Sequence, residues 1–132
     1  MMSIEALVIE ASEDTPRVRL DPHIGVFELV GNSYPENSTK FYAPILEWFR
    51  TYSESEAPRG MTIDFSFDYF NTSSAKYILE ILRFIQDFHD TGKPCLIRWH
   101  YFEDDTDMQE AGEDYQSTLT VPFQLLERTD TY

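Results

Sequence analysis

The stretch of sequence that decides the fold is Tyr69-Phe70-Asn71-Thr72-Ser73-Ser74-Ala75-Lys76. Before it, residues 61–69 alternate strictly between apolar and polar side chains, which is the pattern of a β-strand with one buried face. After it, apolar residues recur at helical spacing over residues 78–88. Small polar residues such as Asn71 are preferred caps of a helix. The stretch therefore predicts a strand that leads directly into a helix.

The same junction is the candidate functional centre. The first turn of a helix exposes backbone N–H groups and the positive end of the helix dipole, so it suits an anion. The hydroxyl groups of Thr72, Ser73 and Ser74 can also accept a phosphoryl group. We therefore predict a phosphorylation site or a phosphate-binding site. The simpler alternative is that Asn71, Thr72 and Ser73 only cap the helix, which is worth about 1 kcal/mol.

The sequence before this unit predicts a sheet edge and one helix. Three short strands are expected, at Ile4–Ile9, Arg17–Leu20 and Gly25–Val30, with the last two forming an antiparallel hairpin. A loop of turn-forming residues, 31–38, follows them. Because proline fits best in a first turn, the regular part of the next helix is expected to begin near Ala43.

The sequence after the unit predicts another strand at Pro94–Tyr101, a short exposed helix at Glu103–Tyr115 and a last strand at Leu119–Leu126. Pro122 indicates that this last strand lies at a sheet edge. A strand-helix-strand order implies a right-handed crossover and parallel neighbours. We therefore expect an α/β fold, a mixed sheet with helices mainly on one face, as a single domain over residues 1–132 with its core at about 4–127.

Composition excludes several classes of function. The 132 residues include 24 acidic and 10 basic side chains, for a net charge of −14. Nucleic acids and anionic membranes require basic patches, so this balance argues against both and favours basic protein partners. No stretch approaches the ~20 apolar residues of a membrane span, and we expect a cytoplasmic protein. The single cysteine, Cys95, is predicted to be a buried, inert thiol.

An enzymatic alternative rests on the polar face of the predicted sheet. Asp64, Asp68, Arg98 and His100 could share this face. Paired carboxylates with a histidine can bind a metal ion or act as acid and base. Cross-strand ion pairing is the more common outcome for such residues. No nucleophilic triad spacing, glycine-rich phosphate loop or zinc motif is present, so nucleophilic and nucleotide-driven enzymes have no support, and we predict no cofactor. A metal-dependent enzyme that uses Asp64, Asp68 and His100 stays the less favoured alternative.

Two segments resemble the SiaC-type family of bacterial regulatory phosphoproteins. They are Gly31-Asn32-Ser33-Tyr34-Pro35-Glu36-Asn37-Ser38 and the stretch Tyr69–Lys76, with Pro44 and Trp48 between them. Members of this family have a compact STAS-like fold, similar to anti-sigma-factor antagonists. The resemblance covers roughly residues 5 to 127. One departure is Ala43, which stands where the typical family sequence has an acidic helix cap.

The resemblance implies a switch and not an enzyme. In such systems a dedicated protein kinase phosphorylates the domain and a metal-dependent phosphatase reverses the modification. The unmodified form engages an effector, which in the best-known arrangement is a diguanylate cyclase of cyclic-di-GMP signalling. By position, the phosphoacceptor of the family falls on Thr72. The effector itself does not carry over, because related switch domains serve different outputs.

Further site residues follow from these arguments. Lys76 lies one helical turn after Thr72, so it can pair with a phosphate there. We expect the domain to tolerate the phosphate, whereas a partner packed over Thr72 would lose affinity. The residues expected next to the phosphate are Asn71, Ser73, Ser74 and Lys76, and those expected to bind partners are Tyr34, Pro35, Glu36, Asn37, Tyr69 and Phe70. The alternatives are that residues 34–37 merely connect two elements, or that the chain is a constitutive interaction module.

Overall fold

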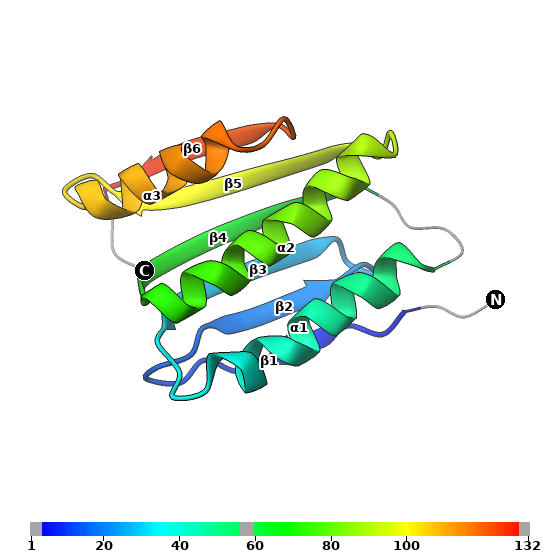
Figure 1. Cartoon of the computed structure of the whole chain (residues 1–132), viewed down its shortest axis with the longest axis horizontal. Helices are drawn as coiled ribbons and strands as arrows, with labels where there is room; N and C mark the ends of the chain where they lie inside the picture. Colours follow the sequence, from blue (N-terminus) through cyan, green and yellow to red (C-terminus); the bar gives the residue numbers. More distant parts are fainter. Residues whose placement is uncertain (1–3, 56–59, 130–132) are drawn as a thin grey trace.

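The computed structural model describes residues 4–55 and 60–129 and contains one six-stranded sheet covered by helices. The elements are β1 (Leu7–Ile9), β2 (Arg17–Asp21), β3 (Val26–Ser33), α1 (Ser38–Ser53), β4 (Met61–Phe70), α2 (Thr72–Asp90), β5 (Cys95–Phe102), α3 (Thr106–Ser117) and β6 (Phe123–Arg128). All three helices lie on the same face of the sheet (Figure 1). The predicted α/β class, with helices on one side of a mixed sheet, is confirmed.

The strands lie in the sheet in their sequence order, from β1 to β6. β1 pairs with β2 and β2 with β3 in antiparallel fashion, which confirms the predicted hairpin. The pairs β3–β4, β4–β5 and β5–β6 are parallel, because a helix crosses over between each of them. As a result, α1 and α2 both begin at the end of the sheet where β3 and β4 finish (Figure 1).

The hydrophobic core lies between the sheet and the helices. β4 contributes alternate apolar side chains to it, and α1 and α2 contribute one face each. The largest side chains with almost no exposed surface are Trp99, Tyr42, Phe49, Phe65, Leu20, Leu29, Ile45, Ile63, Ile78, Ile81, Leu82 and Ile85. Burying one such aliphatic or phenyl side chain stabilises the fold by roughly 1.5–3 kcal/mol, so this layer fixes the positions of both helices.

The alternation predicted for β4 fails at the end of the strand. The pairing with β3 skips Asp68, and the next residue, Tyr69, pairs with Asn32. This β-bulge reverses the two faces, so that Phe70 packs against Trp99 while Tyr69 is 54% exposed. The expectation that Tyr69 continues the buried face was therefore wrong. A single extra residue leaves no mark in an apolar–polar pattern.

The start of α1 also differs from the prediction. The helix begins at Ser38 and not near Ala43, because the side chain of Asn37 caps it by accepting a hydrogen bond from the backbone N–H of Lys40 at 3.0 Å. Pro44 lies inside the helix. Its missing N–H leaves one carbonyl without a helical partner, on an exposed side of the helix where water can serve it. The cap, together with the burial of Tyr42 in the turn before Pro44, outweighs this cost.

Several other element bounds shift. β1 begins at Leu7, and β3 continues to Ser33, so that the loop before α1 shortens to residues 34–37. α3 covers Thr106–Ser117, and β6 begins at Phe123, immediately after Pro122 at the predicted sheet edge. Within the described residues, no helix combines the length and apolar composition needed to cross a membrane. The cytoplasmic location stays a prediction.

Candidate functional site

Two helix N-termini meet at the end of the sheet where β3 and β4 finish. The backbone N–H of Asn71, at the start of α2, donates to the carbonyl of Ser33 at the end of β3, at 3.0 Å. The hydroxyl of Ser38, in the first turn of α1, lies 2.6 Å from the hydroxyl of Ser73 in the first turn of α2. The loop before α1 and the junction before α2 therefore lie side by side at this end of the sheet.

Asn71 caps α2, as the sequence predicts. Its side-chain oxygen accepts hydrogen bonds from the backbone N–H of Ser74 at 2.9 Å and from the hydroxyl of Ser73 at 3.1 Å. The backbone N–H groups of Thr72 and Ser73 donate to no residue in the described part of the chain. They remain as anion-binding donors at the positive end of the α2 dipole.

The three hydroxyl residues of the junction have different environments. Ser74 is fully buried, and its hydroxyl donates to the carbonyl of Ser33 at 3.0 Å. Ser73 is exposed but bonded to Ser38 and Asn71. Thr72 is exposed, and its hydroxyl makes no hydrogen bond to a residue of the described ranges. Thr72 therefore carries the hydroxyl that an approaching enzyme can reach without breaking an internal bond.

A buried hydroxyl chain supports this first turn of α2. The hydroxyl of Ser33 donates to that of Ser74 at 2.8 Å, and the hydroxyl of Tyr42 lies 2.5 Å from that of Ser33. Because Ser33 and Ser74 each have one proton and use it within this chain, Tyr42 is the donor to Ser33. Burial raises the pKa of Tyr42, although the neighbouring hydroxyls of Ser33 and Ser74 oppose this, so Tyr42 keeps its proton at neutral pH.

Sequence reasoning missed the supporting residues Ser33, Ser38 and Tyr42. They lie more than thirty positions away from the residues they contact across the site. Their hydroxyl side chains are common, and nothing in a single sequence pairs a serine at the end of one strand with a serine in a distant helix. The weak signal available was their position, since each flanks or follows the loop of residues 34–37.

Lys76 is exposed on α2, one turn after Thr72. Its ammonium group lies 5.4 Å from the centre of the Tyr77 ring and forms no ion pair with a residue that the structure describes. The Tyr77 hydroxyl is in turn 2.6 Å from that of Thr39 in α1. The charge of Lys76 is therefore available beside the junction.

Two exposed tyrosines lie together on this surface. The ring centres of Tyr34 and Tyr69 are 5.9 Å apart, and the two residues are 37% and 54% exposed. Glu36 is also exposed, whereas Pro35 is buried and Phe70 points into the core. Contiguous exposed aromatic rings are typical of protein-binding surfaces. Of the residues predicted to bind partners, the structure thus presents Tyr34, Glu36, Asn37 and Tyr69 outward.

The polar face of the sheet contains the predicted ion pairs. Arg98 donates to both carboxylate oxygens of Asp64 at 2.8 Å, and His100 Nε2 lies 2.7 Å from one of them. Partial burial raises the pKa of Asp64, but hydrogen bonds from His100 and Arg98 outweigh it and leave this pKa below its ordinary value. Asp68 lies outside the network, in the bulge. Among the described residues, no three His, Cys, Asp or Glu side chains are placed to hold a metal ion.

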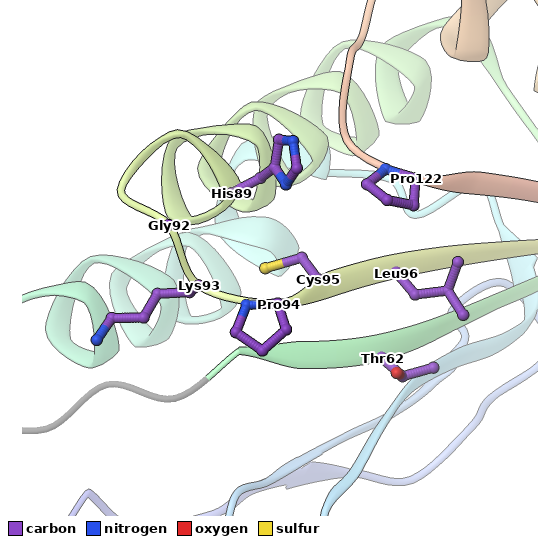
Figure 2. A pocket seen from close by; sticks show the side chains of 8 residues that line it. All are labelled: Thr62, His89, Gly92, Lys93, Pro94, Cys95, Leu96 and Pro122. Carbon is purple, nitrogen blue, oxygen red and sulfur yellow. The ribbon is translucent and has the colours of Figure 1, made fainter.

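A separate cavity of about 430 Å³ lies at the opposite end of β4 and β5 (Figure 2). It is lined by Thr62, His89, Gly92, Lys93, Pro94, Cys95, Leu96 and Pro122. The thiol of Cys95 is buried, as predicted, and burial raises its pKa despite a backbone hydrogen bond at Met61. It is therefore a protonated, unreactive thiol at neutral pH.

Comparison with known proteins links the chain to a family. A family model described as "SiaC family regulatory phosphoprotein" matches residues 9–128. An uncharacterised protein of Pseudomonas aeruginosa (strain UCBPP-PA14) is 30% identical over 117 residues, covering 89% of this chain and 92% of that protein. The structure of SiaC of Pseudomonas aeruginosa matches with a TM-score of 0.83 and 30% identity, covering 96% of this chain and 100% of that chain.

A further match is the crystal structure of the diguanylate cyclase SiaD in complex with its activator SiaC, also from Pseudomonas aeruginosa. The TM-score is 0.84 at 29% identity, and the match covers 92% of this chain and 99% of that chain. That SiaC is thus an activator of a diguanylate cyclase. The likeness extends over nearly the whole length of both proteins.

Proposed function

The chain belongs to the SiaC family of regulatory phosphoproteins, and on this premise we propose that it is a non-enzymatic partner switch whose phosphoacceptor is Thr72. The observation that carries the proposal is the different state of the three hydroxyls at the α2 N-terminus. Ser74 is buried, Ser73 is bonded twice, and Thr72 is exposed and unbonded. A kinase would therefore find one accessible acceptor at this junction.

The domain is suited to carry a phosphate on Thr72. The group would add between one and two negative charges beside the N–H groups of Thr72 and Ser73, at the positive end of the α2 dipole. Lys76 lies one turn away with its charge unpaired among the described residues. The phosphate would therefore be tolerated by the fold without rearrangement of the core.

A partner would respond differently. The exposed pair Tyr34–Tyr69 and the residue Glu36 lie at the same end of the sheet as Thr72. A partner that packs on these rings would also cover the first turn of α2. A phosphate on Thr72 would then be buried in the interface, and the cost of removing its hydration would weaken binding of the partner. The unmodified form is thus the one that binds.

We infer that the effector of the unmodified form is a diguanylate cyclase of the host. Support comes from the similar SiaC of Pseudomonas aeruginosa, which was crystallised as the activator in complex with the diguanylate cyclase SiaD. A cognate kinase and a metal-dependent phosphatase would set the state of Thr72. The competing function is a constitutive interaction module, in which Thr72 is never phosphorylated and has only a structural role at the start of α2.

The first experiment maps phosphate on the protein taken from its host, by peptide mass spectrometry with and without phosphatase treatment. We expect phosphate on Thr72 that the phosphatase removes. Phosphate on Ser73 alone would make Ser73 the phosphoacceptor in place of Thr72. If no phosphate is found under several growth conditions, the constitutive module is the better account. A kinase assay then compares Thr72→Ala with Ser73→Ala, of which only the first should abolish incorporation.

The binding surface is tested separately. Tyr34→Ala and Glu36→Ala, in the bare protein, should each weaken binding to a diguanylate cyclase of the host, and Tyr34→Ala should do so by at least about tenfold because aromatic residues dominate binding surfaces. Leu79→Ala, on α2 and outside this binding surface, is the control variant and should bind like the parent. Native affinity of both Tyr34→Ala and Glu36→Ala would contradict this part of the proposal.

A further inference from the structure

Hydrogen bonds from β3 and α3 hold the first turn of α2. The hydroxyl of Ser74 donates to the carbonyl of Ser33, at the end of β3, at 3.0 Å. The Tyr115 hydroxyl, from α3, donates to the carbonyl of Ala75 at 3.0 Å. Because these contacts are buried or partly buried, they hold the turn in one orientation, and its exposed hydroxyls keep the directions that the fold gives them.

The contact from α1 is different, because it engages an exposed hydroxyl. Ser38, in the first turn of α1, is 7% exposed, and its hydroxyl lies 2.6 Å from that of Ser73. Ser73 is exposed and uses its own proton in a 3.1 Å bond to the side-chain oxygen of Asn71. A hydroxyl has one proton, so Ser38 is the donor, and Ser73 both donates and accepts. The neighbouring Thr72 hydroxyl makes no such bond to a residue that the structure describes.

Phosphorylation needs both the oxygen and the proton of the acceptor hydroxyl. The oxygen forms a bond to the γ-phosphorus of a nucleoside triphosphate, the bond from that phosphorus to the β-phosphate oxygen breaks, and the nucleoside diphosphate leaves. The hydroxyl proton passes to a carboxylate base of the kinase. At Ser73 the oxygen accepts from Ser38 and the proton is held by Asn71. Both bonds therefore have to break before this hydroxyl can turn toward a kinase.

We propose that Ser38 is a specificity-determining residue, which keeps Ser73 from being phosphorylated and so confines the phosphate to Thr72. This role rests on the proposed function, because it needs a kinase that acts at this junction. Loss of one hydrogen bond of this kind changes an equilibrium about fivefold. Without the Ser38 hydroxyl, phosphorylation of Ser73 should therefore rise by at least that factor, while the environment of Thr72 stays the same.

The two neighbouring positions also differ in what a phosphate would do to the fold. A phosphate on Ser73 would need the space that the Ser38 hydroxyl occupies, and it would push the first turns of α1 and α2 apart. A phosphate on Thr72 breaks no hydrogen bond of that side chain to the described residues. Phosphorylation confined to Thr72 therefore leaves the loop of residues 34–37 in place beside the junction.

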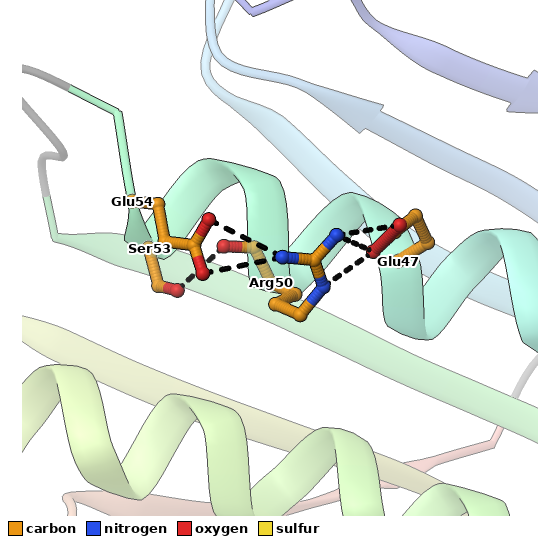
Figure 3. Close-up of polar contacts among 4 residues, drawn as sticks. All are labelled: Glu47, Arg50, Ser53 and Glu54. Carbon is orange, nitrogen blue, oxygen red and sulfur yellow. Dashed lines mark hydrogen bonds and ion pairs between the residues drawn. The ribbon is translucent and has the colours of Figure 1, made fainter.

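A matched control lies at the other end of α1. Ser53 is exposed, and its hydroxyl donates to the carbonyl of Arg50 at 2.7 Å, beside the ion pairs of Arg50 with its neighbours on the helix (Figure 3). Ser53→Ala thus removes one hydroxyl and one hydrogen bond from the same helix as Ser38→Ala, far from Ser73. Because Ser73 is exposed, water can replace the donor lost in Ser38→Ala. Thermal unfolding of both variants should therefore stay close to that of the parent.

The experiment maps phosphate by peptide mass spectrometry on the parent, Ser38→Ala and Ser53→Ala, each expressed as the full chain in the native host. Each is also made together with Thr72→Ala, which removes the competing acceptor. We expect Ser38→Ala to raise the ratio of phosphate on Ser73 to phosphate on Thr72 by at least about fivefold, and Ser53→Ala to leave it unchanged. Thr72→Ala alone should carry almost no phosphate, and Ser38→Ala combined with it should carry phosphate on Ser73. A merely structural role of Ser38 would change the total phosphate and leave the ratio as it is.

Asn71→Ser tests the other hydrogen bond of Ser73, and it keeps the role of this contact testable if Ser38→Ala does not fold. Serine is as good a helix cap as asparagine. The substitution nevertheless withdraws the amide oxygen that accepts from the Ser73 hydroxyl. Asn71→Ser should therefore also raise the share of phosphate on Ser73.

Three outcomes would overturn the role of Ser38. They are an unchanged ratio in Ser38→Ala, an equal rise in Ser53→Ala, and phosphate shared evenly between Thr72 and Ser73 in the parent. In the first two cases the parent still carries its phosphate on Thr72, so the proposed switch is unaffected. Absence of phosphate from the parent and from every variant would contradict the proposed function, and the role of Ser38 with it.

Discussion

The hydroxyl groups of Ser38 and Ser73 lie 2.6 Å apart and join the first turns of α1 and α2 across 35 positions of sequence. Because Ser73 donates its proton to Asn71, Ser38 is the donor of this bond. The bond holds the loop of residues 34–37 beside the junction that carries Thr72. The surface proposed to bind partners and the proposed phosphoacceptor are thereby fixed relative to one another.

Removing the buried hydroxyl of Ser74 should destabilise the protein. Ser74→Ala leaves the hydroxyl of Ser33 without its acceptor inside the core, and an unsatisfied buried group costs about 1–3 kcal/mol of unfolding free energy. Ser53→Ala, at an exposed position of α1 where the hydroxyl donates to the carbonyl of Arg50, should cost less than about 1 kcal/mol. Urea unfolding of both variants measures the difference. Equal losses would show that burial of the hydroxyl chain contributes nothing.

A negative charge at position 72 should not harm the fold. Thr72→Asp places a carboxylate beside the free N–H groups of the α2 N-terminus, so we expect its unfolding free energy to equal that of the parent or exceed it by about 0.3–1 kcal/mol at low salt. Thr72→Asn is the uncharged control, and added salt should remove the difference between them. A lower stability of Thr72→Asp than of Thr72→Asn would contradict the electrostatic account.

Substitution of Gly112 should destabilise α3, although glycine is a poor helix former. A Cβ atom at this position would come within 2.5 Å of the Trp99 ring and 2.6 Å of Leu125. Gly112→Ala is therefore expected to lower the unfolding free energy by about 1–3 kcal/mol through overpacking, against a gain of up to ~1 kcal/mol in helix propensity. Gln109→Ala on the same helix serves as the control in the same thermal unfolding assay. A stabilised Gly112→Ala would show that the helix can move away from the sheet.

The contacts of Asp64 with Arg98 and His100 should make the unfolding free energy depend on pH in the acid range. Partial burial opposes ionisation of Asp64, but His100 and Arg98 lower its pKa below the unfolded value overall. The folded state therefore binds this proton less readily than the unfolded state does. The resulting stabilisation is fully present above the ordinary aspartate pKa of about 4 and is lost as the pH falls through the lower folded pKa.

Unfolding free energies measured between pH 2 and pH 7 test this sign. Asp64→Asn should be less stable than the parent at neutral pH, and the difference should shrink in acid. Asp68→Asn, in the bulge, should follow the parent curve more closely, because Asp68 forms no ion pair with a described residue. A constant gap between the parent and Asp64→Asn across this pH range would contradict the assignment.

Local patterns account for most of the fold. The alternation over residues 61–67 and the helical spacing over residues 78–88 predict β4 and α2, because each pattern reflects burial of one face of one element. The cap at Asn71 is likewise a property of adjacent residues. The errors fall where two local preferences compete. Pro44 argues for a late start of α1, but the cap formed by Asn37 and the burial of Tyr42 prevail.

The sequence alone determined the order of the elements, the strand-to-helix junction and the candidate hydroxyls within it, since all of these depend on neighbouring residues. Only the tertiary structure decided which hydroxyl is free. Ser33, Ser38 and Tyr42 reach the junction from distant elements and engage Ser73 and Ser74, leaving Thr72 exposed. The bulge at Asp68, likewise, turns Tyr69 outward to meet Tyr34. Contacts between distant segments form only when the sheet aligns its strands, so no local pattern records them.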